Sequence, residues 1–116
     1  MNTFKELTTL SHIEKLIEKN PLAFLYISQP NCSVCHGLQP QIERILANFP
    51  KIKAYKVDAY KVPEIAGRFH IFTAPVLLLF VNGKEYIREA RIVQTELFNQ
   101  KITRIYNNMT DSNRQR

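Results

Sequence analysis

Two uninterrupted apolar runs constrain what this chain can fold into more than any other feature of its sequence. Leu22–Ser28 reads LAFLYIS and Val76–Val81 reads VLLLFV, and each run directly follows a proline. Strands buried on both faces have such continuous runs, whereas half-exposed strands alternate apolar and polar residues. The two runs therefore predict the central strands of a sheet that is covered on both faces.

Helical patterns stand before, between and after these two runs. The first begins with SHIE, where Ser11 and Glu14 have the spacing of a capping box, and it ends at Asn20-Pro21. The second follows the two cysteines, and Pro40 inside it should kink the helix. The predicted helices run from Ser11 to Asn20, from the cysteine pair through Phe49, from Pro63 to Phe69 and from Glu96 to Asn107.

Further strands complete the predicted sheet. Ala54–Ala59 reads as a strand, and Asn82-Gly83 is a strong signal for a two-residue hairpin that leads into a return strand, Lys84–Ile92. Phe4–Leu7 is a candidate short edge strand. Alternating helices and strands that close with a hairpin predict an α/β fold: a mixed central sheet of four to five strands, flanked by helices on both faces.

The length, hydropathy and charge of the chain limit the classes of protein to which it can belong. The 116 residues suggest one domain, residues 1–109, with a polar and disordered tail at 110–116. The N-terminus lacks the apolar segment of a signal peptide, and no apolar run reaches the roughly 18–20 residues of a membrane span. We therefore expect a cytoplasmic protein without a membrane partner. The net charge of +6 is scattered along the chain, which favours a solvated surface over a nucleic-acid site.

The chain has only two cysteines, in the stretch NCSVCH, and three interpretations are open for them: a metal site, a structural disulfide or a redox pair. A structural zinc site usually needs four ligands; His36 is adjacent, but His12 and His70 lie on other segments, so we expect no metal. A permanent disulfide is disfavoured in a reducing cytoplasm. A redox role fits better. Cys32 stands where a helix begins, and the free amides at a helix start stabilise a thiolate. Cys35 follows one helical turn later.

With these residues the chain resembles the thioredoxin superfamily. The Cys-x-x-Cys follows a buried strand, and Thr73–Lys84 reads TAPVLLLFVNGK, with Pro75 at the position of the family's cis-proline. Pro40 stands five residues after the second cysteine, where the family kinks its helix, and Lys56–Ala59 reads KVDA before a short helix. The resemblance spans Thr9–Asn107 and implies the thioredoxin fold.

The resemblance also implies a function. The chain would be a thiol–disulfide oxidoreductase that acts on protein disulfides, with Cys32 as nucleophile and Cys35 as resolving thiol. The backbone of Ala74 and a cis Pro75 would form the substrate groove, together with Asn31 beside the first cysteine. No bound cofactor is implied, and electrons would come from a reductase or a low-molecular-weight thiol. The alternative is a binding module or redox-responsive switch without turnover.

Several residues depart from the thioredoxin pattern. Tyr26 replaces the buried aspartate beneath the second cysteine; as a phenol it is a poor base, and it is either a modulator of the site or simply a core aromatic. The alignment places Ala54 where the family has a lysine near that aspartate. His36 is either a stabiliser of the Cys32 thiolate or a surface residue. The segment Glu89–Gln94 is bulkier than the family's glycine-containing loop.

Overall fold

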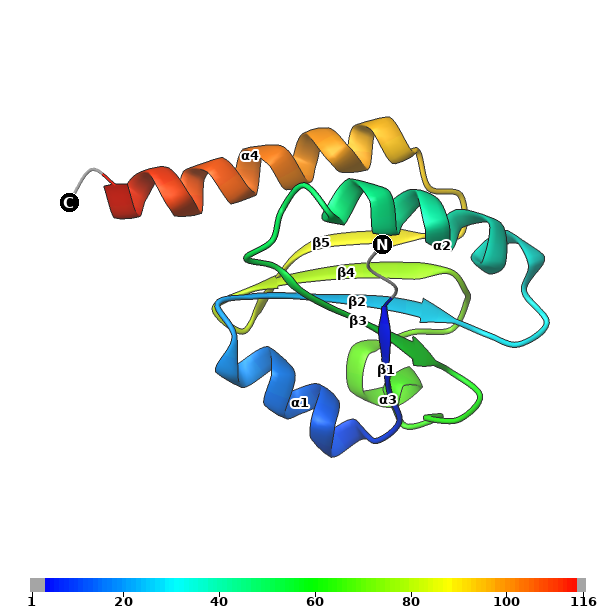
Figure 1. Ribbon diagram of the computed structural model, residues 1–116. Coiled ribbons are helices and arrows are strands. Elements are labelled where there is room, and N and C mark those ends of the chain that lie inside the picture. Colours follow the sequence, from blue (N-terminus) through cyan, green and yellow to red (C-terminus); the bar gives the residue numbers. More distant parts are fainter. Residues whose placement is uncertain (1–3, 115–116) are drawn as a thin grey trace.

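The computed structural model describes residues 4–114, with side chains through Thr110. The described chain forms one sheet of five strands. Helices lie on both sides of this sheet (Figure 1). In chain order the elements are β1 (Lys5–Leu7), α1 (Leu10–Lys19), β2 (Leu22–Ser28), α2 (Ser33–Leu46), β3 (Lys53–Asp58), α3 (Ile65–Phe69), β4 (Val76–Val81), β5 (Lys84–Ala90) and α4 (Thr95–Arg114).

The sheet is mixed, and its strand order is β1-β3-β2-β4-β5. Strand β3 pairs in parallel with β1 and with β2, whereas β4 is antiparallel to both β2 and β5. Helices α2 and α4 cover one face of the sheet, and α1 and α3 cover the other (Figure 1). The predicted α/β architecture with helices on both faces is confirmed.

The covered faces explain the two apolar runs. In β2, Phe24 and Tyr26 belong to the hydrophobic cluster beneath α2 and α4, and Ala23, Leu25 and Ile27 belong to the cluster that contains α1 and α3. Successive side chains of a strand point to opposite faces, so a strand covered twice is apolar at every position. Strand β4 follows the same rule, and all six of its residues are buried.

The strand predictions agree closely with the structure. Strands β2 and β4 have the predicted bounds, and β1 is the short edge strand. Asn82 and Gly83 both have positive φ, at 50° and 83°, which is the geometry of a type I′ hairpin turn. Strand β3 begins one residue earlier than predicted. Strand β5 ends at Ala90 instead of Ile92, because Arg91 turns into the left-handed region with φ 67°.

Two helix predictions at the N-terminal side need correction. Helix α1 is capped by Thr9, whose side-chain oxygen accepts the His12 N–H at 3.2 Å, so Ser11 lies inside the helix and is not its cap. Helix α2 ends at Leu46, and Phe49 is reached through a turn. Pro50 follows Phe49, and the residue before a proline disfavours the helical region.

Helices α3 and α4 also differ from their predicted bounds. Helix α3 begins at Ile65, because Pro63 lies in a tighter turn whose carbonyl accepts the Ala66 N–H at 3.2 Å. Helix α4 continues through Arg114, beyond the predicted end at Asn107. No glycine or proline interrupts this stretch, and polar composition alone does not end a helix. The disordered tail at 110–116 stays a prediction.

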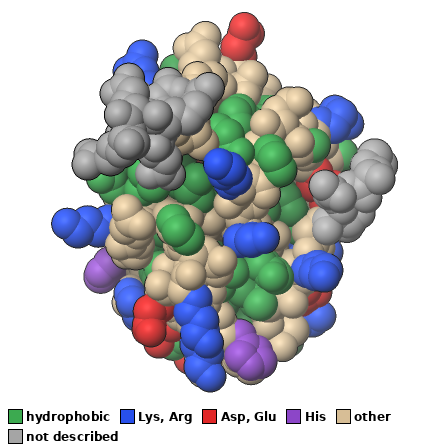
Figure 2. Space-filling model, turned by 60° about the vertical axis from the view of Figure 1, so that its left-hand side comes forward, with side chains coloured by type: hydrophobic (Ala, Val, Ile, Leu, Met, Phe, Trp, Pro, Cys, Tyr) green, Lys and Arg blue, Asp and Glu red, His purple; other side chains and the backbone are tan. Residues whose placement is uncertain are grey.

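One face of the molecule carries its charges in a dispersed pattern. Figure 2 shows Lys and Arg side chains spread among hydrophobic and uncharged polar side chains over the described part of one face. Nucleic-acid sites gather basic residues on one face. Within the described chain, no helix has both the length and the hydropathy that a membrane crossing requires.

Candidate active site

Cys32 is the N-cap residue of α2, as the sequence predicted. Its Sγ accepts the backbone N–H of Cys35 at 3.1 Å, and its carbonyl accepts that of His36 at 3.2 Å. The first amides of a helix have no partner within the helix and lie at the positive end of its dipole. A thiolate at this position is therefore stabilised by a directed hydrogen bond and by the helix itself.

The two cysteines differ in accessibility. They are joined by a disulfide, with 5.2 Å between their Cα atoms. Cys35 is fully buried, whereas Cys32 is half-buried and opens onto a groove. A large substrate can therefore reach only Cys32.

The groove brings together four residues that the sequence predicted for the site. It has a volume of about 560 Å³, and Asn31, Cys32, Ala74 and Pro75 line it. The Ala74–Pro75 peptide bond is cis. Within the described chain, no hydrogen bond uses the backbone N–H or C=O of Ala74, although each is a strong hydrogen-bonding group. These groups are free to pair with an extended segment in the groove.

The loop after β5 forms part of the groove. Its bulk was noted from the sequence, but none of its residues was predicted as a site residue. Arg91, Ile92 and Val93 line it, and the Arg91 N–H donates to the Pro75 carbonyl at 2.9 Å. The left-handed φ of Arg91 costs a residue with a side chain roughly 1–2 kcal/mol. The sequence showed only that this segment is bulky, because the sign of φ at a residue other than glycine leaves no clear sequence signal.

Exposed apolar side chains surround Cys32. Val34 and Ile92 line the groove and are 59% and 86% exposed. Tyr60, which is 80% exposed, lines a neighbouring hollow that shares Asn31 with the groove. Clustered exposed apolar residues mark surfaces that bind other molecules.

Tyr26 lies beneath the cysteines and is fully buried. Its hydroxyl donates a hydrogen bond to the backbone carbonyl of Cys35. Burial raises the pKa of this phenol well above its ordinary value, and the Glu43 carboxylate raises it further. The hydroxyl therefore stays protonated at neutral pH and acts as a donor to the helix, so it cannot serve as a base for Cys35.

Lys56 on β3 lies beside Tyr26 on β2. In the parallel pairing of β2 with β3, the Cα partner of Tyr26 is Lys56, whereas Ala54 pairs with Phe24. The placement of Ala54 at the family's lysine position stays a prediction. Lys56 is half-buried and lines a polar hollow together with His36 and the acidic residues Glu6 and Asp58.

His36 is exposed, and its ring faces away from the groove. Its Nε2 lies 3.1 Å from the carbonyl oxygen of Pro30, which can only accept, so this nitrogen carries the proton. His36 does not line the groove that contains Cys32. Its role as a modulator stays a prediction. In the described part of the chain, no three residues of the types His, Cys, Asp and Glu come close enough to hold a metal.

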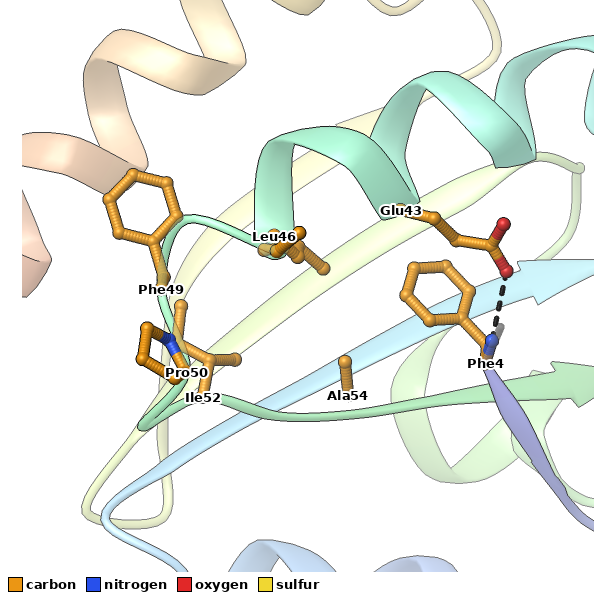
Figure 3. Close-up of a pocket in the computed structure, with 8 residues that line it drawn as sticks. Phe4, Glu43, Leu46, Phe49, Pro50, Ile52 and Ala54 are labelled. Atoms are coloured by element: carbon orange, nitrogen blue, oxygen red, sulfur yellow. Dashed lines mark hydrogen bonds between the residues drawn. The ribbon is translucent and has the colours of Figure 1, made fainter. Parts of the chain in front are cut away.

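A part-buried contact from the residue before β1 lies next to Tyr26. The Phe4 N–H donates to Glu43 Oε2 at 2.8 Å, and the Gln39 amide donates to the same oxygen at 3.0 Å. The Phe4 ring centroid is 5.8 Å from that of Tyr26. Figure 3 shows Phe4 and Glu43 at one end of a cavity of about 220 Å³ beneath α2. Glu43, a carboxylate near Tyr26, was not identified from the sequence.

Arg88 fixes the segment that leads to the groove. Its guanidinium donates to the carbonyl of Phe69 at 2.7 Å and to the carboxylate of Glu85 at 2.8 Å. The hydrogen bond from Arg88 lowers the pKa of Glu85, and the same bond raises the pKa of Arg88. The end of α3 is thereby tied to β5, which holds the chain that continues to Ala74.

Known proteins share this arrangement. A family model described as Thioredoxin matches residues 3–104. Thioredoxin-like protein YdfQ of Bacillus subtilis is 48% identical over 105 residues, which cover 88% of this chain and 94% of that protein. Thioredoxin-1 of Saccharomyces cerevisiae is 30% identical over 77 residues, covering 66% and 75%. The solved thioredoxin of Fasciola hepatica has a TM-score of 0.77 at 26% identity, covering 87% of this chain and 98% of its own.

Proposed function

Because the chain belongs to the thioredoxin family, we propose that Cys32 is the attacking thiol and Cys35 the resolving thiol of a thiol–disulfide oxidoreductase. The observation that carries this assignment is the hydrogen bond from the Cys35 N–H to the Cys32 Sγ at the start of α2. It favours negative charge on the one sulfur that opens onto the groove. The same fold buries Cys35 directly behind it.

The reaction proceeds in two exchanges. The Cys32 thiolate attacks one sulfur of a substrate disulfide, so that a mixed disulfide forms and the first substrate thiolate leaves. The Cys35 thiolate then attacks Cys32 Sγ, which forms the Cys32–Cys35 disulfide and releases the second substrate thiolate. Two electrons pass from the dithiol to the substrate, and each released thiolate takes up a proton. The oxidised pair corresponds to the disulfide in the structure.

The substrates are proteins with accessible disulfides. An extended substrate segment lies in the groove, where the free backbone groups of Ala74 pair with it and Pro75 and Asn31 flank it. A reductase or a low-molecular-weight thiol returns the pair to the dithiol, and no bound cofactor takes part. The compartment is the cytoplasm, where such donors keep thiols reduced.

Trapping of mixed disulfides tests the assignment of the two thiols. In Cys35→Ser the mixed disulfide with Cys32 cannot be resolved, so covalent complexes should accumulate when the protein meets cellular disulfide proteins. Mass spectrometry then identifies the peptide bound at position 32. The matched control is Cys32→Ser, which keeps one cysteine but removes the accessible sulfur, and it should trap nothing.

Turnover separates an enzyme from a switch. The wild type should accelerate the reduction of insulin by dithiothreitol well above the rate with dithiothreitol alone, and either single serine variant should lose this activity. Equal trapping by both variants would overturn the roles of the two thiols. A wild type that forms its disulfide but does not accelerate insulin reduction would favour a redox-responsive binding module instead.

A further inference from the structure

The groove beside Cys32 contains a charge that the reaction itself does not need. Arg91 is the only charged residue among the described residues that line it, and none of the ion pairs in the described chain involves its guanidinium. Its backbone N–H is bound to the Pro75 carbonyl at 2.9 Å, so the residue is fixed next to the segment that binds substrate.

The backbone conformation of Arg91 is a second sign that this residue has a role in binding. With φ 67° it lies in the left-handed region, which glycine adopts without cost and arginine does not. Strained residues of this kind cluster at binding sites, and they persist only where the surrounding structure holds them in place. The guanidinium supplies a fixed positive charge and five N–H donors, which match a carboxylate.

We propose that Arg91 is a specificity-determining residue that binds an acidic side chain of the substrate. The partner is a disulfide-containing protein whose reacting cysteine has Asp or Glu nearby in an extended segment. This proposal rests on the proposed function. The exposed apolar side chains of Val34 and Ile92 contact the rest of that segment, and the free backbone groups of Ala74 hold it extended.

The extended conformation fixes where the acidic residue must lie. The reacting cysteine has to point toward Cys32, and in an extended chain the side chains two residues away point to the same side. The adjacent side chains point to the opposite side. Arg91 and Cys32 line the same groove, so the acidic residue belongs two positions from the cysteine, before or after it.

Matched peptide disulfides test this assignment. One host sequence carries a single cysteine, blocked as a mixed disulfide with a neutral thiol, and Glu, Gln or Lys stands two positions away on either side. Reduced protein is mixed with each peptide, and single-turnover rates are measured for the wild type, Arg91→Gln, Arg91→Gly and Arg91→Lys. The same three residues placed directly beside the cysteine form the control series.

The wild type should react faster with the Glu peptide than with the Lys peptide, by about two- to fivefold, the range expected for a solvent-exposed ion pair. The ratio should fall toward one at high salt, because screening weakens exposed charges. Arg91→Gln and Arg91→Gly should abolish the preference for the Glu peptide, and Arg91→Lys should retain this preference. Since the ratio compares two peptides on one protein sample, the fraction of folded protein cancels.

Three outcomes would overturn the proposal. Equal rates for Glu and Lys peptides in the wild type would show that the groove does not select charge. A preference that survives in both Arg91→Gln and Arg91→Gly would place the selecting group elsewhere. If the preference is equally large when the charged residue stands directly beside the cysteine, the extended geometry of the bound segment is contradicted. If the wild type reacts with none of the peptides, the proposed function itself is refuted. The failure of the charge proposal and the failure of the proposed function are therefore distinguishable.

Discussion

Replacing Tyr26 with phenylalanine removes one buried donor and leaves the aromatic ring in the core. The Tyr26 hydroxyl donates to the Cys35 carbonyl, and the ring packs against Phe4 with 5.8 Å between centroids. Tyr26→Phe leaves that carbonyl without this donor, and a buried acceptor that loses its partner costs about 1–3 kcal/mol. At pH 7 the variant should therefore be less stable than the wild type by about that amount.

The difference between the two proteins should shrink in alkali, because burial, followed by the Glu43 carboxylate, raises the pKa of Tyr26. A raised pKa in the folded state favours the protonated form, so its contribution to stability is full below the unfolded pKa of about 10 and is lost as pH rises above it. The loss approaches about 1.4 kcal/mol per pH unit for one proton. The stabilities of wild type and Tyr26→Phe should thus converge at about pH 11–12.

Urea unfolding at constant ionic strength from pH 7 to 11 measures this difference, since the other titrating groups are common to both proteins. The control is Tyr106→Phe, whose hydroxyl only accepts the exposed Lys51 N–H at 3.3 Å and should change stability by less than about 0.5 kcal/mol. A Tyr26→Phe protein as stable as the wild type at pH 7 would refute the hydrogen bond. A difference that stays constant above pH 10 would refute the raised pKa.

Three further predictions concern other parts of the site. In the reduced protein, iodoacetamide should modify Cys32 much faster than Cys35, with a pKa below the roughly 8.5 of a free thiol; equal rates would contradict the helix-capping argument. Arg91→Gly should raise the urea midpoint, by about 0.5–1 kcal/mol of stability, because it relieves the left-handed strain, and a lower midpoint would argue against strain. Glu43→Gln keeps an acceptor for the Phe4 N–H but removes its charge, so thermal and urea unfolding should show a loss of about 0.5–1.5 kcal/mol.

The central strands could be predicted from the sequence because their signal is local and redundant. An apolar run of strand length that follows a proline has few alternatives, and β2 and β4 have the bounds that this pattern indicated. Helix ends are less determined. Thr9 and Ser11 are both good caps, and local sequence does not decide between them; the structure caps the helix with Thr9.

The site could be predicted only in part, for the same physical reason. The positions of the cysteines at the start of α2 follow from their local sequence, and the structure confirms Cys32 as the cap. Lys56 comes to lie beside Tyr26 through the parallel register of two strands, which no local pattern encodes. Arg91 enters the groove through a left-handed backbone that its own side chain disfavours, so propensity points away from the observed conformation.

The strand order also governs how the chain can reach this fold. The hairpin of β4 and β5 closes over two residues, whereas the central pairing of β2 with β4 joins segments that have α2, β3 and α3 between them in the sequence. Long-range pairing must overcome loop-closure entropy before its contacts stabilise anything, so such topologies fold more slowly than helical bundles. The β4–β5 hairpin can thus form early, while the groove beside Cys32 takes shape only when β2 docks against it.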